Sequence, residues 1–489
     1  MFTKYTFQDW EKSTNKPDLI GKIVDAYKEC FEFQHGLDAN EYMAGRNPAV
    51  MDKVIAMKRA FTAQTAEGEE ALSFAKTDIV GNRISNNFFE RFVTQQNQYL
   101  LGYGVTLDDE KKKEALGKDF DIAMQQCGEF ALAQGVSFGF WNNGELQPIE
   151  AASDCRSGAV ALLDEETSDI KVMIQFWQID SEKPTYYRLF EIDGMTKYKK
   201  ADDKITETEP KRAYVNMVRT DATGRSVTGT KNYGILPIIP FYANSNKESE
   251  LKPNIQSKID AYDICMSDFF DNLERANEVY WALSHFDGSV KDIIQQLRLL
   301  DELKIAIPSD DGTAAGAEPR TIDVPYNARK EALALLKKEL YADYMALDMD
   351  ALTGGSLTNV AINAATKNMD LKADKYEYQA ADFVRGVMAL AGVESDTIEF
   401  RRNRIENEIE KADNDLKQAQ TVQLMVTDIG QKEALKHYPL IEHDDETIND
   451  ILADTQAETV GGQPTIEELQ AQIDQMQQET ANGQPQIVE

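Results

Sequence analysis

Two histidines beside a run of carboxylates are the residues in this chain most suggestive of a metal site. His437 and His443 lie six positions apart, and acidic residues occupy 444–446. Ligands on one face of a helix are expected three or four positions apart, and Pro439 also interrupts this segment. The spacing therefore favours a solvated acidic turn. We predict no metal ligands and no other cofactor.

Motifs for phosphate binding or nucleophilic catalysis are absent from the sequence. It contains no Gly-x-x-x-x-Gly-Lys-Ser/Thr, Gly-x-Ser-x-Gly or Gly-x-Gly-x-x-Gly. The pair Gly354-Gly355 lacks the lysine and the flanking strand that a phosphate loop requires. The carboxylates are spread over helical surfaces and are not gathered in an apolar pocket. We therefore expect no catalytic residues and predict that the protein is not an enzyme.

The charge of the chain limits how it could bind nucleic acid. Its 489 residues include 84 acidic and 52 basic side chains, for a net charge of −32. This balance opposes tight binding to phosphates through counterion release. It does not exclude a protein that lets nucleic acid pass without binding it tightly.

The cysteines and the apolar runs indicate a cellular compartment. The four cysteines, at positions 30, 127, 155 and 265, form no Cys-x-x-Cys pair, as is typical of a reducing cytoplasm. The start of the chain has no signal-peptide core, and the apolar run 235–241 is too short to span a bilayer. We expect a soluble protein that is not secreted and has no membrane contact.

The elements that could position functional residues are centred on two helices and the break between them. Apolar residues recur at three- and four-residue steps through 327–348 and again through 360–392, which predicts two amphipathic helices. Glycines and small polar residues between them favour an exposed loop over 349–359. The candidate functional residues of this loop are Asp350, Thr353, Gly354, Gly355, Ser356, Leu357, Thr358 and Asn359. The alternative is a simple connection between helices.

A further helix is expected over 253–278. It pairs with the helix over 327–348 to form a stalk. The apolar faces that we expect to mediate contacts comprise Ile259, Tyr262, Met266, Phe269, Leu273, Leu333, Leu336, Leu340 and Tyr344. Acidic residues, including Asp263 and Asp271, dominate the rest of the first helix. Between the two helices, the pattern predicts strand 279–283, helix 290–303, strand 304–307, a loop over 309–317 and strand 320–324.

The remaining segments complete an α+β, mainly helical chain. Residues 17–97 and 111–133 show helical periodicity, and about 135–240 alternates as an antiparallel meander with one solvated face. A basic cluster at 197–200 fits a solvated strand edge better than a nucleic-acid patch. Residues 393–454 are expected to be helical, and the acidic tail 455–489 is expected to be a mobile end or a weak coiled coil.

The order of these parts resembles the portal proteins of tailed double-stranded-DNA bacteriophages, of the siphophage type. Four segments carry the resemblance: Tyr-Leu-Leu-Gly-Tyr-Gly-Val-Thr (99–106), Leu-Pro-Ile-Ile-Pro-Phe leading into the helix 259–272, Ser-Leu-Thr-Asn-Val-Ala-Ile (356–362), and 427–446. The match spreads over about residues 40–452. One departure is Thr358-Asn359, where the family often has Ser-Gly before the long helix.

The resemblance implies the portal fold, with wing, stem, clip and crown, assembled into a ring with a central channel. The ring is usually of twelve subunits and lies at one capsid vertex. The implied parts are a wing of 1–252 with the long helix 360–392, stem helices 253–278 and 327–348, a clip of 279–326, a tunnel loop of 349–359, a crown of 393–454 and the tail 455–489.

The resemblance also implies the partners. Double-stranded DNA passes through the channel without sequence specificity, and the terminase motor and later a head-completion or adaptor protein dock on the clip. We expect Ser309, Asp310, Asp311 and Gly312 to take part in that docking. Major capsid and scaffolding proteins are further implied partners. The implied location is the portal vertex of the virion, and the host cytoplasm during assembly.

A capsid scaffold or adaptor without a DNA channel is the alternative from a neighbouring class. A scaffold is expected to be mostly coiled coil, whereas this sequence predicts a β-meander and a stalk with a compact insert. The pattern therefore favours the portal.

Overall fold

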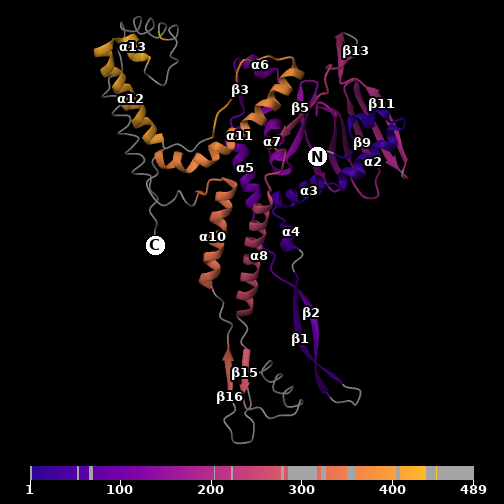
Figure 1. The fold of residues 1–489 in the computed structure, drawn as a ribbon, viewed down its shortest axis with the longest axis vertical. Coiled ribbons are helices and arrows are strands. Elements are labelled where there is room, and N and C mark those ends of the chain that lie inside the picture. The colour runs from indigo at the N-terminus through magenta and orange to yellow at the C-terminus, as the bar shows by residue number, and fades with distance from the viewer. Residues whose placement is uncertain are drawn as a thin grey trace. The chain divides into compact units, whose positions relative to one another are not determined.

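The structure is a computed structural model, drawn in Figure 1. It describes residues 3–51, 54–64, 70–202, 204–221, 224–276, 280–284, 316–320, 326–349, 359–403, 408–436 and 448. The chain divides into two compact units. The first comprises Met1–Gly354 and Ala364–Arg404, and the second comprises Gly355–Asn363 and Ile405–Glu489.

The chain opens with four helices and a long β-hairpin. These elements are α1 (Phe7–Lys12), α2 (Lys16–Lys28), α3 (Phe31–Met43), α4 (Pro48–Met51), β1 (Val54–Gln64) and β2 (Glu70–Val80). The prediction that residues 17–97 are helical throughout is therefore wrong for 54–80. The two strands pair antiparallel along their whole length, from Val54–Val80 to Gln64–Glu70. The backbone N–H and C=O groups of 54–64 and 70–80 therefore bond to the opposite strand, whereas in a helix they would bond within the same segment.

Two helices, not one, lead into the sheets. After α5 (Phe88–Leu101) and β3 (Val105–Leu107), the segment predicted as one helix over 111–133 forms α6 (Glu110–Glu114) and α7 (Phe120–Gln134). Gly117, with φ of 93°, separates them. Gly135, with φ of 89°, ends α7 at the position where the sequence period changes.

The meander over 135–240 forms two principal sheets and a separate hairpin. A six-stranded sheet has the order β11-β10-β9-β8-β7-β6, and a three-stranded sheet has the order β14-β4-β5. The strands are β4 (Val136–Asn142), β5 (Glu145–Glu150), β6 (Ala152–Asp154), β7 (Ser157–Leu163), β8 (Ile170–Trp177), β9 (Thr185–Glu191), β10 (Gly194–Ala201), β11 (Lys204–Arg212), β12 (Val215–Asp221), β13 (Gly224–Lys231) and β14 (Ile238–Tyr242). The Asn-Gly turn at 143–144 joins β4 to β5, and both of its residues have positive φ.

The six-stranded sheet is covered on both faces, which corrects the expectation of a solvated face. Alternate side chains of β7 enter different cores: Val160 and Leu162 pack toward α1–α3, whereas Ala159 and Ala161 pack toward the three-stranded sheet. Phe140 and Phe190 meet between the two sheets, with ring centroids 4.9 Å apart. Alternation alone could not reveal this layer, because small residues also suit a face packed against a second sheet.

A helical core covers the other face of the three-stranded sheet. It includes side chains of α5, α7, α8 (Pro253–Ala276), α10 (Tyr326–Tyr344) and α11 (Asn359–Ala391). Phe241 of β14 stacks on Phe383 and Tyr376 of α11, with centroids 4.7 and 5.6 Å apart. Gly139 leaves the space for this contact, since a Cβ there would lie 2.7 Å from the Phe383 ring.

The insert between α8 and α10 is described only at its base. β15 (Tyr280–Ser284) pairs antiparallel with β16 (Gly316–Arg320). The first strand agrees with the prediction, but the second begins four residues earlier than the predicted 320–324. The predicted helix 290–303, the strand 304–307 and residues 309–312 lie outside the described residues.

The C-terminal part is divided between the units. β17 (Ile398–Phe400) pairs with β3 in the first unit, so the predicted helical segment 393–454 begins with a strand. The second unit contains α12 (Glu408–Ile429) and α13 (Gln431–Leu435), which pack on each other. The tail 455–489 lies outside the described residues. Within the described part of the chain, no helix is both long and apolar enough for a membrane span. The mixture of helices and sheets confirms the α+β class.

Candidate functional site

The two stalk helices, α8 and α10, lie side by side and antiparallel (Figure 1). Lys258 of α8 reaches Glu339 at 3.1 Å and Asp343 at 2.8 Å on α10. Further along the pair, the rings of Phe269 and Tyr326 lie 5.7 Å apart. Polar and aromatic contacts therefore connect the helices along their length.

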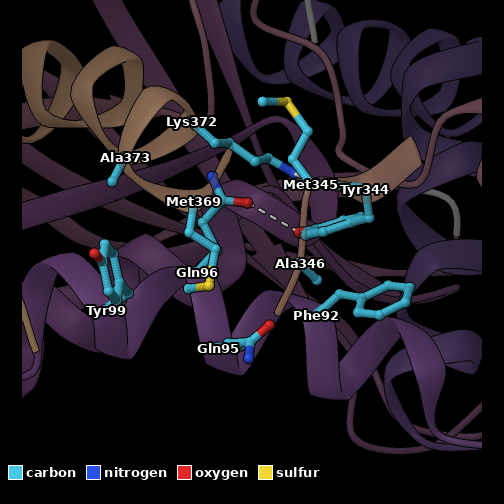
Figure 2. A pocket seen from close by; sticks show the side chains of 10 residues that line it. All are labelled: Phe92, Gln95, Gln96, Tyr99, Tyr344, Met345, Ala346, Met369, Lys372 and Ala373. Atoms are coloured by element: carbon cyan, nitrogen blue, oxygen red, sulfur yellow. Dashed lines mark hydrogen bonds between the residues drawn. The ribbon is translucent and has the colours of Figure 1, made fainter. Parts of the chain in front are cut away.

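At one end of this pair, the apolar side chains belong to the core of the first unit. Ile259, Leu340 and Tyr344 are at most 3% exposed and belong to the helical core. Tyr344 stacks on Phe92 of α5 with centroids 4.6 Å apart, and its hydroxyl donates to Gln96 at 3.0 Å (Figure 2). This packing fixes the end of α10 from which the predicted functional loop departs.

The chain leaves α10 through a tight turn. The N–H of Met345 donates to the Ala342 carbonyl at 3.2 Å, and that of Ala346 to the Tyr341 carbonyl at 2.9 Å, which is the Schellman pattern. Met345 occupies the left-handed position, with φ of 64°. Glycine normally fills this position, so a methionine there must be held by its surroundings.

Gln95 holds the residue that follows the turn. Its side chain accepts from the N–H of Leu347 and donates to the Leu347 carbonyl, each at 3.1 Å. The Leu347 side chain is buried against Tyr99, Met369 and Ala373. The segment 345–347 is thus fixed immediately before the predicted loop.

A buried ion pair binds the end of α10 to α11. Lys372 Nζ lies 2.9 Å from Glu250 and donates to the Tyr344 carbonyl at 3.0 Å. It also lies 3.2 Å from the centre of the Tyr344 ring (Figure 2). The side chains of Lys372 and Glu250 are 15% and 7% exposed. The ammonium therefore contacts the carboxylate, a carbonyl at the negative end of the helix and an aromatic face. We call Lys372, Glu250 and Tyr344 the loop-base cluster.

Burial and charge pairing act in opposite directions on the two charged groups of the loop-base cluster. Burial lowers the pKa of Lys372 to about 8, and Glu250 opposes that effect. Burial alone would raise the pKa of Glu250, but Lys372 and Lys252 outweigh it and hold this pKa below its ordinary value. Asn244 also donates to Glu250 at 3.0 Å, which leaves the carboxylate well satisfied.

No metal centre is found among the described residues. In that part of the chain, no group of three or more His, Cys, Asp or Glu side chains could hold a metal ion. The contacts described above fix the pair α8–α10 and the segment 344–347 at the end of α10.

The predicted stem residues are divided by the structure. Ile259, Leu340 and Tyr344 are buried, and Tyr262 packs against the same core. The half-buried members of the set are Met266, Phe269, Leu333 and Leu336. Leu273 is 38% exposed. Further exposed apolar side chains along the stalk are Ile264, Phe270, Tyr326 and Leu335.

Most of the predicted loop and docking residues are not described. Asp350, Thr353 and 354–358 lie outside the described residues, as do 309–312, His437 and His443. Asn359 is the first residue of α11.

The sequence reasoning missed two groups of buried charges. Asp263 and Asp271 were expected on the exposed surface of α8, but they are 0% and 6% exposed. Lys372 was not singled out, although it lies three residues after Met369 and four before Tyr376, on the apolar stripe of α11. That position was the available signal, because a lysine on an inward stripe needs a buried partner.

Comparison with known proteins identifies the family. The chain matches the family described as phage portal protein, SPP1 Gp6-like, over residues 38–461, and it belongs to that family. This confirms the resemblance drawn from the sequence.

Two relatives are each named portal protein. That of Clostridium phage phiCD119 is 24% identical over 398 residues, which covers 74% of this chain and 82% of the relative. That of Bacillus phage SPP1 is 25% identical over 336 residues, which covers 65% of this chain and 63% of the relative. The matched region thus spans slightly less than two thirds of the Bacillus phage protein.

Solved structures give a weaker likeness. A chain in the virion of a native gene transfer agent particle has a TM-score of 0.38 at 10% identity, over 69% of this chain and 85% of that chain. A chain in the neck of such a particle, computed with C12 symmetry, has a TM-score of 0.36 at 10% identity, over 67% and 84%. Because these scores are low, the family assignment depends on the sequence match.

Proposed function

We propose that this chain is the subunit of a ring at one vertex of a phage capsid, and that double-stranded DNA enters and leaves through its central channel. The match to the portal family over residues 38–461 carries the proposal. The two relatives named portal protein support it. The ring is usually of twelve subunits in this family. It is not an enzyme, and ATP hydrolysis belongs to the packaging motor.

The stem of the proposed ring is the pair of helices α8 and α10. Leu335 is 58% exposed, Phe270 41% and Leu273 38% in the single chain. Apolar side chains along an isolated two-helix stalk are best covered by neighbouring copies. The wing comprises 1–252 with the long helix 360–392, the crown 393–454 and the tail 455–489.

The loop 349–359 is the part that we assign to the channel wall. Its glycines and small polar side chains suit contact with DNA by shape and weak polar interactions, without ion pairing. The loop-base cluster and the Gln95 contacts support this assignment, since a loop that touches a moving polymer needs a fixed base. A simple connection between helices would need no such base.

The clip, residues 279–326, is the proposed docking platform for the terminase motor and later for head-completion proteins. Deleting 312–315 spares β16, which begins at Gly316. We expect this deletion to leave rings intact and to weaken motor binding in a pull-down assay. Full-strength binding by the shortened chain would remove residues 312–315 from the docking surface.

Electron micrographs of the purified full-length protein test the proposal. The expected particles are rings with an open centre, and native mass spectrometry gives their subunit number. A scaffold or adaptor without a channel would give monomers or filled assemblies, and that result would contradict the portal assignment.

A further inference from the structure

The segment that follows the β1–β2 hairpin lies along α8 without joining a sheet. Residues 82–86, which we call the strap, belong to no helix or strand. Their backbone groups therefore need partners other than a β-ladder.

Three side chains of α8 supply those partners, one for every second residue of the strap. Asp271 accepts from the backbone N–H and the side-chain amide of Asn82, at 2.7 and 2.9 Å. The Ser267 hydroxyl accepts from the N–H of Ile84 at 3.0 Å and donates to its carbonyl at 3.4 Å. The strap and the helix therefore run antiparallel.

The third pair completes the series. Asp263 accepts from the Asn86 side chain at 2.7 Å and from its backbone N–H at 3.4 Å. Asn47, which precedes α4, also donates to Asp263, at 2.8 Å. One carboxylate therefore joins the segments on both sides of the hairpin to the same turn of α8.

The repeat distances of the two elements explain the pairing. Four residues of an α-helix advance about 6 Å. Two residues of an extended chain advance about 6.6 Å. Asp263, Ser267 and Asp271 are four apart, whereas Asn82, Ile84 and Asn86 are two apart, so each helical turn meets one strap amide. A slip by one residue would turn the backbone donors away from all three side chains.

The contact is buried, which gives it energetic weight. Asp263 and Ser267 are 0% exposed and Asp271 is 6% exposed. A strap shifted from this register would leave these polar groups without their partners in a position remote from water. The pairing therefore specifies one register more strongly than apolar contacts would.

The hairpin carried by the strap is long and thin. Each strand has eleven residues, or about 36 Å of extended chain. An isolated two-stranded hairpin is at best marginally stable, and its direction depends on how its base is mounted. At the base, α4 packs on α8, and Phe88 after the strap meets Tyr262 with centroids 5.0 Å apart.

We propose that Asp263, Ser267 and Asp271 are positioning residues that fix the β1–β2 hairpin at one register along the stem helix. Loss of these contacts frees the hairpin as a unit, while its own ladder and α8 remain folded. This inference does not depend on the passage of DNA through the ring.

Amide hydrogen exchange resolved to single residues tests the pairing. In the full-length protein, the amides of Asn82 and Ile84 should exchange slowly, whereas those of Arg83 and Ser85 should exchange rapidly. The Asn86 amide should exchange at an intermediate rate, because its hydrogen bond to Asp263 is longer, at 3.4 Å. Ser267→Ala should accelerate hydrogen exchange at the Ile84 amide about tenfold, and Asp271→Ala should accelerate exchange at the Asn82 amide by a similar factor. Asp268→Ala, at an exposed position of α8, is the matched control and should change neither amide.

Uniform exchange along the strap would overturn the proposal. So would an effect of Ser267→Ala that is the same at every strap amide, since that result indicates general loosening. Ser267→Thr keeps the hydroxyl and should restore slow exchange at Ile84, which a purely steric role for Ser267 would not produce.

Distances between spin labels test the positioning role. Labels at Thr62 in the hairpin and Lys338 in α10 are placed in a background with serine at Cys30, Cys155 and Cys265, and labelled chains are diluted with unlabelled ones. The distance distribution should be narrow in that background and broaden in the triple variant Asp263→Ala, Ser267→Ala, Asp271→Ala, while β1 and β2 amides keep their protection. A distribution that stays narrow after the strap amides are released would show that the strap does not position the hairpin.

Discussion

Buried ionisable side chains hold neighbouring segments against α8 and α10 at two sites. Lys372 and Glu250 fix the exit of α10, and Asp263 helps to fix the strap on α8. A buried ion pair adds little net stability relative to apolar residues, but removing one partner leaves a costly isolated charge. Each group therefore has a testable role that differs from simple packing.

Lys372→Met should destabilise the protein by about 3–5 kcal/mol, because Glu250 would remain buried without its cation. Chemical denaturation at fixed protein concentration measures this change. Lys375→Met, at an exposed position of the same helix, is the matched control and should fall within about 0.5 kcal/mol of the unmodified chain. The double variant with Glu250→Gln should recover part of the loss. A single variant as stable as the control would show that the ion pair has no structural role.

Asp263 gives a prediction about pH. Burial raises the pKa of Asp263 above its ordinary value of 3.8, and nearby Asp260 acts in the same direction, whereas Asn86 and Asn47 partly oppose it. The folded state therefore holds this proton more tightly than the unfolded state. Its contribution to stability is full below pH 3.8 and is lost as pH rises through the folded-state pKa.

The stability of the original chain relative to Asp263→Asn should accordingly decrease from pH 3.8 upward and level off above the folded-state pKa. Denaturant midpoints across that range measure the difference, with Asp268→Asn as the control for removing an α8 carboxylate. A difference that grows with pH would reverse the sign and contradict the burial argument.

At the scale of elements, local periodicity predicted long helices well and the hairpin badly. The long helix and the first stem helix match α11 and α8 closely, because each has an apolar stripe that persists for many turns. The hairpin β1–β2 was missed because pairing between strands is not encoded in the period of either strand alone. The same limit applies to the loop-base cluster, whose members come from positions 250, 344 and 372.

Assembly of the stem is the prediction that belongs to this scale. Leu335 lies on the face of α10 away from the buried Leu340 and Tyr344 and is 58% exposed. Leu335→Asp should leave folded protein that forms few or no rings, because a carboxylate would be buried against the neighbouring copy. Native mass spectrometry measures the population of rings. Ile179→Asp, at a residue 81% exposed outside the stem, should assemble normally. Rings in normal yield from Leu335→Asp would exclude this face from the interface.

For the whole molecule, the acidic charge is compatible with DNA that passes without sticking. The net charge is −32, although Asp263 and Asp271 are buried and do not contribute to an exposed acidic face of α8. The loop 349–359 is the surface that we propose DNA meets. Asp348 and Asp350 lie at its N-terminal entrance, and residues 351–359 are uncharged. Friction should stay low as long as no cation is added there.

Replacing Ser356 and Thr358 with lysine should slow DNA packaging, and the effect should be largest at low salt, because each added ammonium pairs with phosphate. Packaging rates measured across ionic strengths test this, with glutamine at the same two positions as the uncharged control. Equal rates for the lysine and glutamine variants at every salt concentration would remove the loop from the path of DNA.

Photo-crosslinking during packaging tests the central claim most directly. Rings that carry p-benzoylphenylalanine in place of Ser356 are irradiated while DNA is held partly packaged, and rings that carry it in place of Ile179 serve as the control. The proposed channel requires a covalent protein–DNA product from position 356 and none from position 179. Intact, DNA-filled particles that give no product at position 356 would contradict the assignment of this loop to the channel.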